Sequence, residues 1–191
     1  MGIPTLIKTL TASGSASLDF VDGTSDVVLD STYDEYMFVF TDINPATDAT
    51  DFSFQVNATD DAGGGYDTSL ITSTYFRAYH EEDDDPAAMG YADNSDQAQS
   101  SAYQQLMYYM GNGSDESGAG ILHLFNPSST TYVKHFYSRC QVTLSGGVSS
   151  ATRSDDDFIA GYINDTTAID EISFKMSSGN FDGVIQLYGI A

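Results

Sequence analysis

The sequence predicts an all-β protein: an antiparallel β-sandwich, jelly-roll-like, with about ten strands and one long polar loop excursion at 81–105. Three observations predict it. Short runs that alternate apolar and polar residues recur along the chain, with few helical patterns between them. Turns rich in Gly, Ser and Asp separate these runs. The chain also holds 13 Tyr and 11 Phe, which favour strands.

The first half of the chain predicts five strands. Residues 5–10 and 16–21 flank the turn TASGS and predict an opening hairpin. Residues 36–43 (YMFVFTDI) form a strongly apolar run. At 52–56 Phe and Val alternate with Ser and Gln, and residues 69–80 are rich in β-branched and aromatic side chains.

The polar excursion at 81–105 follows, with one short helix expected near 95–105. Beyond it, strands are predicted at 120–127, 132–144, 158–164, 168–176 and 183–190. The last two flank SSGNFDG and predict a closing hairpin. The stretch at 145–157 is predicted to be a loop.

The length of 191 residues, without an internal repeat or linker, predicts a single domain over 1–191. Residues 1–10 contain Pro4 and the cation Lys8, and can extend as an arm onto a neighbouring subunit. No run approaches the length of a membrane span or has the layout of a signal peptide.

The charge is the strongest compositional signal. Six Lys and Arg face 28 Asp and Glu, for a formal net charge of −22. This excess disfavours nucleic acids and anionic membranes as partners, since both would be repelled. The acidic runs at 81–85 and 155–157 are interpreted as solvated surface, with weak Ca²⁺ binding by acidic loops as the sharper alternative.

No catalytic or cofactor motif is present in the sequence, so we expect no enzyme, no catalytic residue, no cofactor and no dedicated metal site. Carboxylate pairs can always be chosen from 28 acids, and none has a local signature. Cys140 is the single cysteine, lies in an alternating run and is interpreted as a buried thiol. His80, His123 and His135 match no metal-ligand spacing.

An aromatic run at 103–110 carries the candidate interaction residues. Three interpretations stay open: strand core, a subunit interface and a sugar-stacking site. As a subunit interface it would use five residues of this run together with three of the N-terminal segment: Tyr103, Met107, Tyr108, Tyr109, Met110, Ile3, Pro4 and Leu6.

Three stretches carry a resemblance to a known family. AGYINDTTAIDEISFKMSSGNFDGVIQLYGI (160–190) resembles the C-terminal segment of small structural proteins of tailed bacteriophages, of the kind found in marine and cyanobacterial phages. GAGILHLFNPSSTTYVKHFYSR (118–139) and LIKTLTASGSASLDF (6–20) are similar to other parts of these proteins. The excursion at 81–105 lies outside the resemblance.

The resemblance implies a non-enzymatic β-sandwich subunit of a virion, made in the host cytoplasm. Within a virion, a capsid decoration or cement protein is expected: a homotrimer on the capsid surface that contacts the major capsid protein or other virion proteins. The alternative is a tail fibre or receptor-binding protein whose Tyr-rich loops contact a host surface glycan. A carbohydrate-processing enzyme on a sandwich scaffold is the third hypothesis.

Overall fold

The computed structural model describes residues 2–59, 66, 69–84, 87–144 and 152–191. The all-β prediction is confirmed, with twelve strands and no helix in this part of the chain. The first six strands are β1 (Thr5–Ser15), β2 (Ser17–Val21), β3 (Glu35–Pro45), β4 (Thr50–Ala58), β5 (Ile71–Glu81) and β6 (Ala87–Tyr91). The other six are β7 (Gln104–Met110), β8 (Gly118–Phe125), β9 (Lys134–Leu144), β10 (Arg153–Ile163), β11 (Ile169–Met176) and β12 (Phe181–Ile190).

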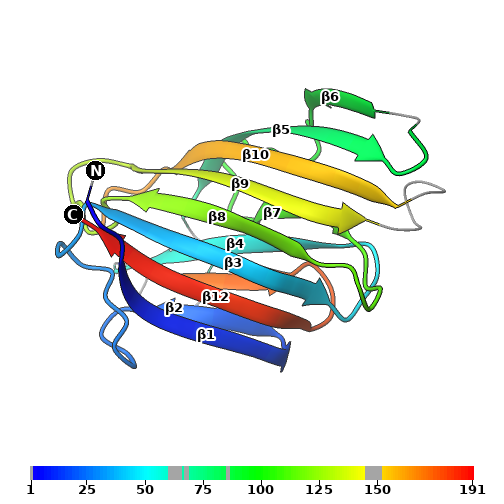
Figure 1. The fold of residues 1–191 in the computed structure, drawn as a ribbon. Helices are drawn as coiled ribbons and strands as arrows, with labels where there is room; N and C mark the ends of the chain where they lie inside the picture. Colours follow the sequence, from blue (N-terminus) through cyan, green and yellow to red (C-terminus); the bar gives the residue numbers. More distant parts are fainter. Residues whose placement is uncertain (1, 60–65, 67–68, 85–86, 145–151) are drawn as a thin grey trace.

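The strands form a sandwich of two unequal antiparallel sheets (Figure 1). The larger sheet has eight strands in the order β1-β12-β3-β8-β9-β10-β5-β6. The smaller sheet has four strands in the order β2-β11-β4-β7. Each pair of neighbouring strands is antiparallel. One face of the large sheet is therefore left outside the sandwich.

A cluster of phenylalanine rings fills the space between the sheets. Phe174 of β11 lies 5.2 Å from Phe38 and 5.3 Å from Phe40 of β3, in ring-centroid distances. On its own sheet it stacks on Phe52 of β4 at 5.9 Å and meets Phe20 of β2 at 6.2 Å. In these strands every second side chain points inward, which is why the predicted strands supply one common core.

All four strands of the two predicted terminal hairpins exist, but the prediction that they pair as hairpins is wrong. β11 lies in the small sheet and β12 in the large one, and β1 and β2 are separated in the same way. The turn at 177–180 is therefore an arch that carries the chain across the core. Alternation of apolar residues predicts which side of a strand is buried, but it does not predict which strand lies beside it. Two consecutive strands can therefore pair in one sheet or pack against each other across the core.

Most connections cross the sandwich in this manner. Among the described strands, the consecutive pairs that are sheet neighbours are β5–β6, β8–β9 and β9–β10. The outer strand β1 pairs with β12, so both chain ends lie together at one end of the molecule (Figure 1). Residues 5–10 of the predicted arm belong to β1, and Ile3 before them is exposed.

The polar excursion contains β6 and, among its described residues, no helix near 95–105. Glutamine side chains fasten it instead. Gln55 of β4 donates from Nε2 to the carbonyl oxygen of Ser101 at 2.9 Å. Gln104 donates to the carbonyl oxygen of Ser95 at 3.1 Å. These amides replace the backbone partners that a helix would have supplied. The described residues contain no helix that could cross a membrane.

Candidate interaction surface

The outer face of the large sheet is built by the alternation of its central strands. In β9 every second residue is buried, and the residues between them point outward. Tyr137 and Arg139 are two of these outward residues. Ladder register then places Phe158 of β10 beside Arg139, and Phe76 of β5 beside Phe158. Residues that are far apart in sequence thus form one continuous row.

We call six outward side chains of β5, β8, β9 and β10 the platform: Phe76, Ile121, His123, Tyr137, Arg139 and Phe158. Ile121 pairs with Arg139, and His123 pairs with Tyr137, in the β8–β9 ladder. The platform is therefore two adjoining rows across four neighbouring strands.

One row of the platform is a stack of planar groups. The rings of Phe76 and Phe158 are nearly parallel, with a 4.9 Å centroid separation and an interplanar angle of 4°. The guanidinium carbon of Arg139 lies 4.8 Å from the ring centroid of Phe158 on the neighbouring strand. Arg139 also forms a bidentate pair with Asp156, at 3.0 Å from Nε to Oδ1 and 2.7 Å from Nη2 to Oδ2. This pairing holds the guanidinium in place.

The second row is centred on Tyr137. Its ring stacks on His123 with a 4.5 Å centroid separation, and the ring of Phe125 lies 5.6 Å away. The Nδ1 atom of His123 contacts a carboxylate oxygen of Glu35, on the adjacent strand β3. Both carboxylates beside the platform, Asp156 and Glu35, are therefore paired within the chain.

Two shallow depressions lie on the platform and share Tyr137 and Arg139 as lining residues. One is lined by the rings of Phe76 and Phe158 and by the small Ala160. Ala160 pairs directly with Tyr137, so a small residue lies between large rings. This arrangement makes a slot that fits an apolar side chain of a partner.

The platform region gathers a large part of the exposed apolar surface. Of the nine large hydrophobic residues that are exposed among the described ones, five lie on β5, β6, β8 and β9 at positions whose register places them on this face: Phe76, Met89, Tyr91, Ile121 and Tyr137. Scattered exposed apolar residues are normal, but a contiguous group marks an interaction site.

The same face is nearly free of unpaired charge. The outward positions of β5, β8, β9 and β10 carry one carboxylate, Asp156, and one guanidinium, Arg139, and these two are paired. In a chain with a net charge of −22, such a face is unusual. Loss of charge combined with exposed aromatic rings is typical of the centre of a protein interface.

Beneath the platform, on the inward side of β10, the acidic run at 155–157 differs from the predicted solvated loop. Strand β10 begins at Arg153, so this run is not a loop. Asp155 and Asp157 point inward and are fully buried, whereas Asp156 points outward. The solvated-surface interpretation is therefore wrong for two of the three carboxylates. Residues 145–151 of the predicted loop lie outside the described residues.

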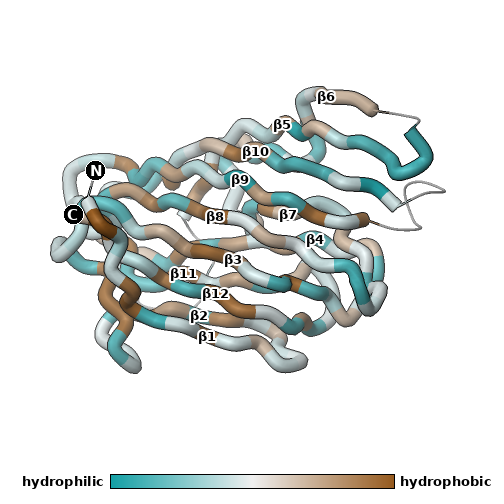
Figure 2. The backbone as a smooth tube through the Cα atoms, in the orientation of Figure 1, coloured by the Kyte–Doolittle hydropathy of each residue, from teal (hydrophilic) through white to brown (hydrophobic). Residues whose placement is uncertain are grey.

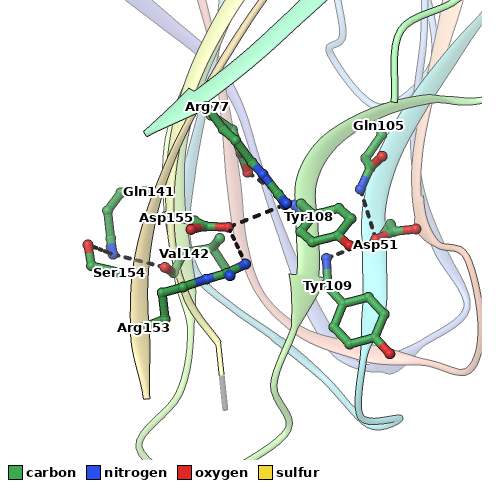
Figure 3. Close-up of polar contacts among 11 residues, drawn as sticks. Asp51, Arg77, Gln105, Tyr108, Tyr109, Gln141, Val142, Arg153, Ser154 and Asp155 are labelled. Atoms are coloured by element: carbon green, nitrogen blue, oxygen red, sulfur yellow. Dashed lines mark hydrogen bonds and ion pairs between the residues drawn. The ribbon is translucent and has the colours of Figure 1, made fainter. Parts of the chain in front are cut away.

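Two arginines offset the buried carboxylates (Figure 3). Arg153 donates from Nη2 to Oδ2 of Asp155 at 3.0 Å, and Arg77 of β5 lies 3.6 Å from the same oxygen. Figure 2 shows the hydrophilic ends of β5 and β10 side by side at this corner of the large sheet. Burial raises the pKa of Asp155, although both guanidinium groups act to lower it.

Asp157 lies deeper in the sandwich, and burial raises the pKa of its carboxyl to about 7. The nearby Asp155 adds to this shift, while the backbone N–H of Tyr108 opposes it by donating to Asp157 Oδ2 at 3.1 Å. A carboxyl group in this state exchanges its proton near neutral pH. It is enclosed between the sheets, so we assign it a role in stability rather than in binding.

The aromatic run at 103–110 forms β7 with an irregularity at Tyr108 and Tyr109. The β4–β7 register jumps between Met110 and Met107, and Tyr109 has a positive φ of 50°. The freed backbone N–H of Tyr109 donates to Oδ1 of Asp51 at 2.8 Å (Figure 3). A bulge of this kind turns two successive residues away from the ladder and bends the strand.

The structure separates the eight predicted interface residues. Met107 and Met110 are fully buried in the core, which is the first of the interpretations left open for this run. Tyr108 and Tyr109 are half-buried and pack against the core. Of the remaining four, Ile3, Pro4 and Leu6 are exposed and Tyr103 is half-buried, and their contact with another subunit stays a prediction.

The other candidate residues are placed clearly. Cys140 is buried, as predicted, and burial raises the pKa of its thiol to about 12. His80, His123 and His135 all point to the outer face of the large sheet. Within the described residues, no three His, Cys, Asp or Glu side chains are grouped so that they could hold a metal ion. In the first acidic run, Glu81 at the end of β5 is buried, so the solvated-surface interpretation is wrong for it; residues 82–84 are exposed, and Asp85 lies outside the described residues.

A third depression, of different chemistry, lies on the small sheet, beside the segment before β7. Its lining is polar and includes Asn94, Asp96, Gln97, Tyr103, Gln105 and Lys175. The ammonium nitrogen of Lys175 lies 4.0 Å from the ring centroid of Tyr103. We call this depression the polar groove.

Comparisons with known protein families, with curated proteins and with solved structures found no match to this chain. The sequence gives only a partial signal for the platform. Its residues lie on four strands whose order in the sheet, β8-β9-β10-β5, cannot be predicted from the local sequence of each strand. Only the alternation of β9, which predicts Tyr137 and Arg139 on one face, was readable beforehand.

Proposed function

We propose that the chain is a non-enzymatic virion structural protein of a tailed bacteriophage, acting as a capsid decoration or cement subunit. The sequence resemblance over 6–20, 118–139 and 160–190 supports the phage context. The observation that carries the assembly role is the platform: a contiguous aromatic face, with its charges paired, on a chain of net charge −22. Such a face is what a subunit of a larger assembly needs.

The acidic remainder of the surface fits this role as well. It keeps the free subunit soluble after synthesis in the host cytoplasm and limits contacts to the face where carboxylates are paired. In the particle, this subunit sits on the capsid surface and contacts copies of itself and the major capsid protein.

The proposal is tested by quantitative mass spectrometry of purified particles from the phage that encodes the chain. A decoration subunit is present in a constant ratio to the major capsid protein, in the range of tens to hundreds of copies for each particle. Incubation of the purified chain with particles that lack it then restores that ratio. Absence of the chain from washed particles, and failure to bind to them, contradicts the proposal.

One observation favours the second candidate function, a receptor-binding protein for a host glycan. The polar groove presents amide, carboxylate and ammonium groups beside the ring of Tyr103. Sugars are recognised by hydrogen bonds to hydroxyl groups together with contact on an aromatic ring. Loss of glycan binding on substitution of Tyr103→Ala, with a copy number of a few for each particle, would favour this function over decoration.

A further inference from the structure

We propose that the platform binds a second copy of this chain, so that two subunits associate through the outer faces of their large sheets. The inference deepens the proposed function and rests on it for its biological context.

Charge selects the partner. A basic partner would be attracted to the unpaired carboxylates on the rest of the surface, and it would bind there rather than on the platform, where the carboxylates are paired. A strongly acidic partner is repelled everywhere except at a face without free carboxylates. The second copy is such a partner, since it carries the same net charge of −22. The charges of Arg139 and Asp156 offset each other on the platform, and the carboxylate of Glu35 at its edge contacts the ring of His123.

Shape supports the same partner. An association of two copies about a two-fold axis is isologous, so each platform must offer both projecting groups and a recess. The projecting groups are the exposed side chains of Ile121 and Tyr137, and the recess is the slot over Ala160. One face therefore carries both halves of a self-complementary contact.

The stacking of the rings also favours a protein partner over a sugar at this site. Phe158 has Phe76 stacked on its ring at 4.9 Å and the Arg139 guanidinium carbon 4.8 Å from the same centroid. A sugar that needs the open face of Phe158 would have to displace one of them. Ring edges and aliphatic side chains stay exposed, and these pack against another protein surface.

The experiment is sedimentation equilibrium of the purified full-length chain over a range of concentrations and of NaCl concentrations. We expect a mass that rises with concentration from that of one chain toward that of two, and association that strengthens as salt screens the repulsion between the acidic surfaces. Ile121→Asp adds an unpaired carboxylate to the platform and is expected to weaken association at least tenfold. The matched control is Tyr132→Asp, at an exposed residue in the β8–β9 connection, which should leave association unchanged.

Each outcome is decisive because folding is checked in parallel by circular dichroism and thermal melting. Ala160→Arg is the second variant: it fills the slot at an exposed position, so it blocks association without removing core contacts. A wild-type chain that stays monomeric at all concentrations and salt levels overturns the inference. So does equal weakening by Tyr132→Asp. A monomer that still binds to particles would overturn this inference alone and leave the proposed function standing.

Discussion

The carboxylate of Asp157, on the large sheet, accepts a hydrogen bond from the backbone N–H of Tyr108, on the small sheet, at 3.1 Å. Asp51 accepts from the next backbone N–H, that of Tyr109, at 2.8 Å. Two carboxylates thus satisfy the two donors that the bulge in β7 removes from the ladder. This arrangement ties the edge of the small sheet to the strand that carries the platform on its other face.

The stability of the protein should fall as the pH rises from about 4 to about 7. The pKa of Asp157 is about 7 in the folded chain against a usual value of 3.8, so only the folded state holds the proton in this window. Three units of pKa difference correspond to about 4 kcal/mol of unfolding free energy. Burial also raises the pKa of Asp51 and Asp155, so both groups add to the loss of stability as the pH rises. Urea unfolding at pH 5 and pH 8 covers the upper two of these three units, so the measured difference in unfolding free energy should be about 3 kcal/mol.

The variant Asp157→Asn isolates the contribution of this carboxyl group. Its amide oxygen still accepts from Tyr108 and its charge is gone, so its stability should decline less between pH 5 and pH 8 than that of the wild type. Asp156→Asn is the matched control, one residue away and pointing outward. Parallel curves for the wild type and Asp157→Asn would show that the group does not titrate in this window.

Lys134 should be among the side chains on which folding depends most strongly. It is fully buried on the inward side of β9, and its ammonium group donates to the backbone oxygens of Asp165, at 3.1 Å, and of Thr167. Both oxygens belong to the connection between the two sheets. Lys134→Met removes both hydrogen bonds, and the unfolding free energy should drop by about 3 kcal/mol. Lys8→Met, on the edge strand β1, should change it by less than about 0.5 kcal/mol.

The arch between β11 and β12 requires a glycine. Gly179 has φ of +75°, and a Cβ at this position would lie 2.3 Å from Oγ1 of Thr47. Gly179→Ala should lower the unfolding free energy by about 1–2 kcal/mol, measured by thermal melting. Gly90→Ala in β6 is the control, because its Cβ would meet no atom within 4 Å. Equal melting temperatures for the two variants would contradict this explanation of the arch.

Tyr108 should contribute to monomer stability and not to association. The guanidinium carbon of Arg77 lies 3.9 Å from the centroid of its ring, inside the corner that holds Asp155 (Figure 3). Tyr108→Ser should cost about 1–2 kcal/mol of unfolding free energy and leave the sedimentation mass unchanged. Dissociation of the oligomer without loss of stability would instead place Tyr108 in the subunit interface.

Local pattern predicted the strands well and their neighbours poorly. The run HFYSRCQVTL alternates so regularly that β9 and the buried Cys140 follow from it. The predictions of an opening and a closing hairpin are wrong because a Gly-rich turn can connect two strands of one sheet or two strands of opposite sheets. Which of the two connections forms depends on how both sheets pack. Phe76 and Phe158 meet through strand order alone, which no local signal encodes.

The prediction of a solvated loop for the acidic run at 155–157 is wrong for a different reason. Alternate residues of this segment are buried, as in a strand. The residues on the buried side of β10 include Arg153, Asp155, Asp157 and Ile159. Composition suggested solvent, because buried carboxylates are rare unless they are paired. Asp155 pairs with Arg153, two residues away on β10, and with Arg77 on β5, which is distant in sequence and is brought close only by the fold.

Cryo-electron microscopy of the intact particle that carries this chain is the decisive test of the decoration role. We predict many copies of the sandwich on the capsid surface, at symmetry axes, with the platforms of neighbouring copies facing one another. A particle whose capsid surface lacks this chain would contradict the decoration role. A few copies confined to the tail, with the polar groove pointing outward, would transfer the assignment to host attachment.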